Sequence, residues 1–270
     1  MQIKATAVLL LLSLLPLASA RHSKSTTAKS TGGTSPTTTT GGTAPTGCAP
    51  GYYLPEITNF SLQLPYGKNA GSSPLEITGA ELAGCGGYQN ASWFYWDTEG
   101  DYMVMKAPPN DTDCAHTSGS LHCRTELREE NPDIWSPSGT NTMTVKLKVA
   151  VADDGDYGTV IGQVFATYSK PVCELFYAPD GVITLGVEQT TEGGHDIFYQ
   201  VGTIPINTEF TYEYSYSNNI LSLSINGGTP QMFPTSQLGN PNSYFKVGDY
   251  DQGKTHYAEV DIYSIVIVHT

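Results

Sequence analysis

The chain has 270 residues, of which 39% are hydrophobic and 14% are charged. This is enough apolar material for one sizeable core, and it excludes a chain that is disordered throughout. Thirteen basic residues stand against 26 acidic ones, and four of the bases lie in residues 1–47, so the rest of the chain carries a net charge of −17. A nucleic-acid-binding surface needs clustered Lys and Arg, so this balance excludes nucleic acid as the partner.

The first 47 residues carry targeting and linker patterns instead of a core. A basic residue precedes an apolar run over 7–17, and Ala18 and Ala20 supply the small side chains of a cleavage site, so residues 1–20 are predicted to be a signal peptide. The apolar run is too short to span about 30 Å of hydrocarbon. Residues 21–47 are rich in Thr, Ser, Gly and Pro, which predicts a disordered linker. We therefore expect a secreted, extracellular protein with no membrane partner.

An exported chain is also expected to carry glycans and disulfides. Acceptor sites for N-glycans stand at Asn59, Asn90 and Asn110. Five cysteines favour two disulfides and one remaining thiol. Cys114 and Cys123 flank a short loop and are predicted to pair, and Cys48 with Cys85 is the second predicted pair. Because neither a Cys-x-x-Cys nor a His-Glu-x-x-His pattern occurs, no metal or other cofactor is expected.

Residues 48–270 are predicted to form one all-β domain. Short alternating runs separated by Gly, Pro, Asn and Asp fill this region, with hardly any stretch of helical period. Residues 142–149 place apolar and polar side chains on opposite faces of a strand. Residues 212–225 predict a hairpin that turns at Asn218 and Asn219. The apolar segment 258–269 is predicted to lie mid-sheet.

Three segments place polar residues on one face of a predicted strand. In residues 124–128 (RTELR), two bases and an acid share a face, with Thr125 and Leu127 opposite. Residues 163–165 (QVF) point Gln and Phe together, and residues 244–252 (YFKVGDYDQ) align two Tyr, a Lys and a Gln. A single such segment is typical of a solvated strand face. Three of them on neighbouring strands would build one site.

These segments match, in sequence and in order, the three motifs of the family 7 polysaccharide lyases, which are alginate lyases. The family motifs read R-[ST]-E-L-R, Q-[IV]-H and Y-F-K-x-G-x-Y-x-Q, and the chain resembles this family over most of residues 50–270. The resemblance implies a β-jelly-roll fold of two antiparallel sheets with a concave substrate cleft. It also implies a monomeric enzyme that cleaves an anionic polysaccharide by β-elimination, in which neutralising the uronate carboxylate makes the C5 proton removable.

The resemblance assigns a role to each motif residue. Arg124 and Gln163 would bind the carboxylate, and Tyr250 would act on the proton and on the leaving O4. Positive neighbours would favour its phenolate form. The residues expected to bind other parts of the substrate are Glu126, Arg128, Lys246, Tyr244 and Gln252.

Phe165 departs from the family pattern, because it stands where the third residue of the second motif is His. In guluronate the C5 proton and O4 leave from opposite faces, which calls for two groups. In mannuronate and glucuronate both lie on one face, and a single Tyr can serve. The sequence therefore predicts a syn-eliminating lyase acting on mannuronan-type alginate or on glucuronan.

His122 offers a second route to an imidazole in the site. It lies two residues before Arg124, so it projects onto the same strand face and is a further catalytic candidate. The alternative is a surface histidine at the start of a strand.

Two other function classes compete with the lyase. Glu259 and Asp261 share a strand face and resemble the carboxyl pair of a jelly-roll glycoside hydrolase. Trp93 to Trp96 could stack on sugars in a non-catalytic polysaccharide-binding module, although an aromatic strand more often belongs to a core. An acidic segment, 153–156, could hold calcium, but its spacing favours a hairpin turn.

Overall fold

The computed structural model describes residues 47–67, 73–110, 114–117 and 119–270. These residues belong to one compact unit, Ala44–Thr270. The predicted signal peptide and nearly all of the predicted linker lie outside the described residues. Within the described part of the chain, no helix is long and apolar enough to cross a membrane.

The unit is a sandwich of an eight-stranded and a seven-stranded antiparallel sheet, which confirms the predicted all-β jelly roll. The larger sheet has the order β10-β9-β8-β7-β14-β5-β1-β2. Its strands are β1 (Phe60–Gln63), β2 (Glu76–Ile77), β5 (Arg124–Glu129), β7 (Thr159–Ala166), β8 (Lys170–Tyr177), β9 (Val182–Val187), β10 (Ile197–Thr203) and β14 (Ser243–Tyr250).

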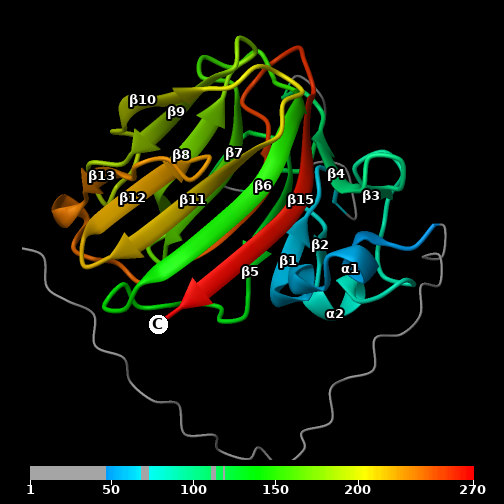
Figure 1. The fold of residues 1–270 in the computed structure, drawn as a ribbon, viewed down its shortest axis with the longest axis horizontal. Helices are drawn as coiled ribbons and strands as arrows, with labels where there is room; N and C mark the ends of the chain where they lie inside the picture. The colour runs from blue at the N-terminus through cyan, green and yellow to red at the C-terminus, as the bar shows by residue number, and fades with distance from the viewer. Residues whose placement is uncertain (1–46, 68–72, 111–113, 118) are drawn as a thin grey trace, which may run out of the picture. The chain divides into compact units, whose positions relative to one another are not determined.

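The smaller sheet has the order β13-β12-β11-β6-β15-β4-β3. Its strands are β3 (Phe94–Asp97), β4 (Tyr102–Ala107), β6 (Asn141–Val151), β11 (Phe210–Ser217), β12 (Ile220–Ile225), β13 (Gln231–Pro234) and β15 (Ala258–His269). Figure 1 shows β11, β6 and β15 side by side in the near layer.

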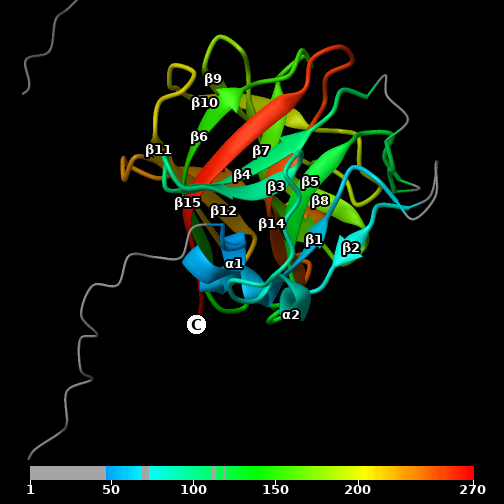
Figure 2. The ribbon, with the colours of Figure 1, turned by 90° about the vertical axis from the view of Figure 1, so that its right-hand side faces the viewer.

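The described residues also contain four short helices. They are α1 (Pro50–Tyr53), η1 (Pro55–Asn59), α2 (Gly79–Leu82) and η2 (Ser236–Leu238), of which η1 and η2 are 3-10 helices. Figures 1 and 2 place α1 and α2 together beside β1, at one end of the two layers.

The predicted alternation of β6 is confirmed. Met143, Val145, Leu147 and Val149 are fully buried between the sheets, while the residues between them are at least partly exposed. Tyr212 on β11 crosses the core and donates its hydroxyl hydrogen to the carbonyl of Ile161 at 3.0 Å. The two layers are therefore joined by hydrogen bonds as well as by apolar packing.

The predicted hairpin and the predicted central strand are also confirmed. β11 and β12 are joined through Asn218 and Asn219, whose φ angles of 48° and 64° are those of a turn that suits the twist of a hairpin. β15 lies between β6 and β4.

Two disulfides join residues that the sequence paired, Cys48 with Cys85 and Cys114 with Cys123. Cys173 is the cysteine outside these bonds, and it is buried in the core between the sheets. The first disulfide fixes the α1 end of the unit, and the second closes a loop directly before β5.

Gly248 shapes the part of β14 that carries the third motif. Its φ angle is 145°, and a Cβ atom there would lie 2.6 Å from the carbonyl oxygen of Thr125. The pairing of β14 with β7 shifts register between Val247 and Tyr250. Glycine thus allows the close approach of β14 to β5 at the bulge immediately before Tyr250.

Candidate active site

The three motifs lie on adjacent strands, β5, β14 and β7, in the middle of the larger sheet. Leu127, Val164 and Phe245 point into the core and are fully buried, so the alternating motif residues share the other side of the sheet. We call this side the catalytic face. Tyr250 pairs with Arg124, and Lys246 pairs with both Arg128 and Gln163. The predicted gathering of the motif residues is therefore found.

Glu126 lies at the centre of this cluster. Its side chain is 1% exposed, and its carboxylate accepts hydrogen bonds from Gln163 Nε2, from Arg124 Nη1 at 3.4 Å and from Lys246 Nζ. The three donors come from three different strands. Because its oxygens are already engaged, Glu126 orients the groups around it and is poorly placed to bind sugar itself.

Arg124 keeps most of its hydrogen-bonding capacity unused. It is 4% exposed, and its Nε and Nη2 atoms are buried without a partner, as is Gln163 Oε1. Buried donors normally have partners, and leaving them without any costs free energy. A guanidinium held this way can take a carboxylate with two parallel hydrogen bonds.

Tyr250 lies against the same guanidinium. Arg124 Cζ is 4.0 Å from the centre of the Tyr250 ring, and the phenol hydroxyl is 2.6 Å from Ser120 Oγ. Burial raises the pKa of Tyr250, and the positive charge of Arg124 offsets only part of this rise. The expectation that its neighbours would favour the phenolate is thus not met in the free protein, where the side chain is a phenol.

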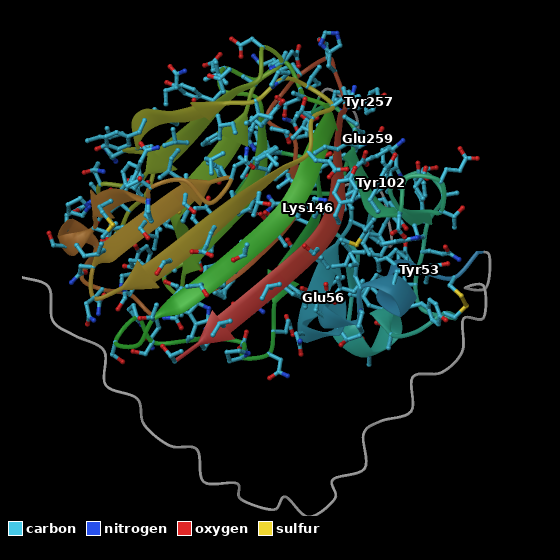
Figure 3. All side chains as sticks on the ribbon, in the orientation of Figure 1. Tyr53, Glu56, Tyr102, Lys146, Tyr257 and Glu259 are labelled. Carbon is cyan, nitrogen blue, oxygen red and sulfur yellow. A yellow bond between two sulfur atoms is a disulfide. The ribbon has the colours of Figure 1, made fainter. Side chains whose placement is uncertain are left out.

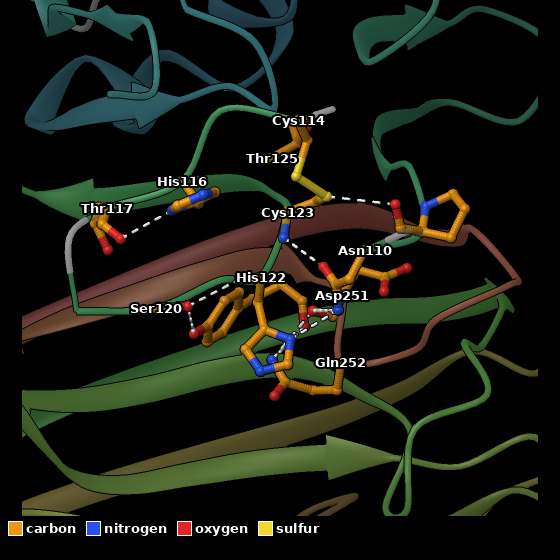
Figure 4. The surroundings of a disulfide bond; sticks show 12 residues. Asn110, Cys114, His116, Thr117, Ser120, His122, Cys123, Thr125, Asp251 and Gln252 are labelled. Carbon is orange, nitrogen blue, oxygen red and sulfur yellow. Dashed lines mark hydrogen bonds between the residues drawn. A yellow bond between two sulfur atoms is a disulfide. The ribbon is translucent and has the colours of Figure 1, made fainter. Parts of the chain in front are cut away.

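His122 adjoins Tyr250, with ring centres 5.7 Å apart and the rings perpendicular. Asn110 Oδ1 accepts the backbone N–H of Cys123 at 2.7 Å, which turns Asn110 Nδ2 toward His122 Nδ1, also at 2.7 Å (Figure 4). Since an amide nitrogen only donates, we infer that Nδ1 accepts and that the neutral ring carries its proton on Nε2. Burial and Arg124 lower the pKa of His122, so its neutral form is favoured.

Phe165, at the position of the family histidine, makes apolar and cation–π contacts. Its ring centre lies 5.4 Å from that of Tyr244 and 5.3 Å from Lys246 Nζ. Arg128 stacks on Tyr244 at 4.2 Å and forms ion pairs with Glu130 and Asp133, each at 2.6 Å. The charge of Arg128 is therefore largely engaged before any substrate binds.

Gln252, the last residue of the third motif, lies beyond the end of β14. Its Nε2 donates to the carbonyls of Tyr250 and Asp251, at 3.2 and 3.3 Å. These bonds hold the backbone that follows β14. The neighbouring acidic segment 153–156 is tied to the same loop, because Asp153 accepts the N–H of Gln252 at 2.6 Å.

The residues of the rival functions lie in the other sheet. Glu259 pairs with Lys106 at 2.9 Å and Asp261 with Lys148 at 3.3 Å. Figure 3 shows Glu259 on the near layer with Lys146 and Tyr102. The aromatic strand β3 also belongs to this sheet, where Phe94 is fully buried. Neither group adjoins the catalytic face.

Sequence reasoning missed three residues that support the site. Ser120 binds the Tyr250 hydroxyl and accepts the N–H of His122 at 3.1 Å. Glu129 accepts from Trp135 Nε1 at 2.8 Å and from the N–H of Phe245 at 2.9 Å. Asp249 accepts from Ala107 and Thr159, both at 2.7 Å, and so ties β14 to β4 and β7. The strand positions of Glu129 and Asp249 could have suggested that their carboxylates are buried. No feature of the sequence around Ser120 indicates its contact with Tyr250.

The described residues hold no group of three or more His, Cys, Asp or Glu side chains arranged to bind a metal ion. The catalytic face carries a guanidinium with unpaired donors, an ammonium, an amide, a phenol and the imidazole of His122 beside that phenol.

Comparisons with known proteins agree with this arrangement. A family model described as alginate lyase matches residues 55–269. The crystal structure of alginate lyase A1-II′, a member of polysaccharide lyase family 7, matches with a TM-score of 0.70 at 25% identity, covering 82% of this chain and 99% of that one. The family 7 alginate lyase AlgAT5 matches with a TM-score of 0.66 at 25% identity, covering 82% and 99%.

The alginate lyase from Klebsiella pneumoniae has the same fold, with a TM-score of 0.68 at 20% identity and coverage of 82% and 99%. A search of curated proteins gives no match. Because the family model covers most of the chain and its motif residues meet on one sheet face, the chain belongs to the alginate lyase family, polysaccharide lyase family 7, and is a polysaccharide lyase.

Proposed function

We propose that this protein is a secreted lyase that cleaves a polyuronate by syn β-elimination, acting on mannuronan-type alginate or on glucuronan. The observation that carries the proposal is the buried guanidinium of Arg124, whose Nε and Nη2 have no partner and which lies 4.0 Å from the Tyr250 ring. A uronate carboxylate would fill these donors and bring its C5 carbon next to the phenol.

The carboxylate is bound by Arg124 and by the second N–H of Gln163 Nε2, whose first N–H is held by Glu126. Neutralising this charge makes the C5 proton more acidic, because the electrons left behind are delocalised into the carboxyl group as an enolate. Lys246 adds positive charge beside the intermediate. Glu126 holds all three groups and is a positioning residue.

Tyr250 acts as both base and acid. Its phenolate takes the C5 proton, the C4–O4 bond breaks as the C4=C5 double bond forms, and the same phenol returns the proton to O4. This sequence needs the proton and O4 on one face of the sugar, as in mannuronate and glucuronate. Guluronate would need a base on the opposite face, and Phe165 cannot supply one.

His122 acts as a hydrogen-bond donor in this scheme. Its Nδ1 lone pair is taken by Asn110 at 2.7 Å, so the ring can offer only Nε2–H to the substrate or to a neighbouring group. We therefore assign proton abstraction to Tyr250 alone and give His122 a role in orienting Tyr250 or the sugar.

Secretion is part of the same proposal. The two disulfides suit an oxidising compartment, and a polymer too large to enter a cell has to be cut outside it. Release of the mature chain after residue 20 would be seen by N-terminal sequencing of the culture medium.

The test is an ultraviolet assay on mannuronan, guluronan and glucuronan side by side, because a lyase product carries a conjugated double bond and a hydrolase product does not. We expect cleavage of mannuronan or glucuronan and its loss in Tyr250→Phe. Strong activity on guluronan alone, or cleavage by Tyr250→Phe at the wild-type rate, would contradict the proposal. Binding without cleavage of any of the three polymers would favour a non-catalytic module.

A further inference from the structure

An exposed aromatic pair lies at the β10 end of the catalytic face. The rings of Tyr157 and Phe198 stack with centres 4.0 Å apart and an interplanar angle of 15°. The two residues are 37% and 39% exposed. Large aromatic side chains usually stabilise a fold by being buried, so an exposed stacked pair is unusual. Phe176, which is 7% exposed, contacts the edge of Phe198 at 5.9 Å.

The strand register places this pair on the same face as the catalytic residues. Gln163 pairs with Glu174, Glu174 with Gly186, and Gly186 with Phe198. A Cβ atom on Gly186 would lie 3.1 Å from the Phe198 ring, so that ring covers the bare backbone of β9. Three strand spacings separate Phe198 from Gln163, which is roughly 14 Å.

Apolar side chains lead from the phenol toward the aromatic pair, because Val160 and Phe176 form a buried cluster with Tyr250 and Phe176 contacts Phe198. Glu174 lies on the same face, between Gln163 and Gly186. A polysaccharide chain that lies across the strands with one uronate at Tyr250 would reach Phe198 with a sugar a few residues away.

A pocket of about 340 Å³ opens beside the aromatic pair. Its lining includes Asp156, Asp180, Thr184 and Gln200 but no Lys or Arg. Carboxylates accept hydrogen bonds from sugar hydroxyls and repel a sugar carboxylate. The charge here is thus opposite to that at Arg124 and Lys246.

We propose that this pocket binds an uncharged sugar residue of the polysaccharide, stacked on Phe198 with its hydroxyls directed to Asp156 and Asp180. The inference rests on the proposed lyase function and extends its substrate class from pure polyuronates to polymers that also contain a neutral sugar. The preferred polymer carries a uronate at the cleaved position and a neutral sugar several residues away. A pure polyuronate would be cut with this pocket poorly filled.

The experiment compares glucuronan with glucuronan in which part of the carboxyls has been reduced, so that some residues become neutral glucose. Cleavage is followed by ultraviolet absorbance, and kcat/KM is expressed per remaining uronate. The wild type should prefer the partly reduced polymer. Phe198→Ala should lower kcat/KM on that polymer by about five- to tenfold, the size of an aromatic stacking contact, and abolish the preference.

Ile197→Ala is the matched control, because Ile197 precedes Phe198 on β10, is 46% exposed and pairs with the core residue Val187. It should keep the wild-type preference. The double variant Asp156→Asn/Asp180→Asn should cut unmodified glucuronan better than the wild type does. Equal kcat/KM of wild type and Phe198→Ala on both polymers, or a wild-type preference for the unmodified polymer, would overturn the proposal.

Binding separates this proposal from the lyase function. Affinity electrophoresis of Tyr250→Phe, with and without Phe198→Ala, measures retention by the partly reduced polymer without turnover. Loss of retention in the double variant supports the pocket even if no polymer is cleaved by the wild type. Equal retention of both variants would contradict sugar binding in the pocket and would leave the lyase proposal unaffected.

Discussion

Phe165 is the residue whose replacement tests the stereochemical reasoning most directly. Phe165→His restores an imidazole at the position where the family motif has one. If Phe165 is what limits the enzyme to syn elimination, this variant should gain activity on guluronan. It should also keep activity on the wild-type substrate, since Arg124, Gln163 and Tyr250 are unchanged.

The new imidazole should be neutral and able to accept a proton. Lys246 Nζ lies 5.3 Å from the centre of the Phe165 ring, and a full charge at that distance is worth about 3 kcal/mol at an effective dielectric constant of 20. This charge would lower the histidine pKa, less the share that Glu126 offsets. Because Lys246 is only 4% exposed, the lost cation–π contact costs about 2 kcal/mol, which is less than the roughly 5–15 kcal/mol that stabilises a typical domain.

A correctly placed general base typically contributes about 10²- to 10⁴-fold to a rate. We therefore expect guluronan cleavage by Phe165→His to rise at least about a hundredfold, measured as initial ultraviolet absorbance, with mannuronan in parallel. Phe165→Asn is the control, because it brings a polar group of similar reach without a titratable nitrogen. A gain in Phe165→Asn equal to that in Phe165→His would refute the reasoning, as would wild-type cleavage of guluronan and mannuronan at equal rates.

Other measurements test single groups of the site. Burial raises the pKa of Tyr250, so the phenolate fraction and kcat/KM should rise about tenfold per pH unit from pH 6 to 8, below the pH at which Glu174 becomes charged; a flat profile would exclude this base. Burial raises the pKa of Glu174 to about 8, so it is neutral below that pH and charged above it. KM for a polyanion should then increase above pH 8 in the wild type but not in Glu174→Gln, and an equal increase in both would contradict this role. Removing the Cys114–Cys123 disulfide should cost about 2 to 3 kcal/mol of stability, seen as a lower Tm; an unchanged Tm would show that the loop is ordered without it. Asn110 Nδ2 already donates to His122 and to the carbonyl of Asp251, so mass spectrometry should find this glycan acceptor empty, and full occupancy would contradict the observed contacts.

The sequence predicted the face that each motif residue occupies, because alternation in a strand leaves little freedom. Once Leu127 is assigned to the core, Arg124, Glu126 and Arg128 must share the other side of β5. The same reasoning orients Gln163 against Val164. The resemblance to a known family then supplied the neighbour relations among the three strands, which a single strand pattern cannot provide.

The charge state of the site could not be read from the sequence. A Tyr near Arg and Lys suggested an easily formed phenolate, but desolvation of Tyr250 outweighs the attraction of Arg124. Desolvation depends on how much of the chain covers a side chain, and here that cover includes Ser120 from a distant loop. Likewise, the tautomer of His122 follows from its hydrogen bond with Asn110, twelve residues earlier, and no local sequence pattern predicts that hydrogen bond.

The balance of buried charge explains how a strongly acidic protein can bind an anionic polymer. Arg124 and Lys246 would repel each other in the free protein, and Glu126 between them offsets one of their two charges. One positive charge is left over, with two guanidinium nitrogens unpaired, which matches the single carboxylate of one uronate. The net charge of −17 outside the first 47 residues is then no obstacle, because long-range repulsion is screened by salt over about 10 Å, whereas a buried guanidinium acts at contact. Affinity for one carboxylate at one point, and not a basic surface, is what this arrangement provides.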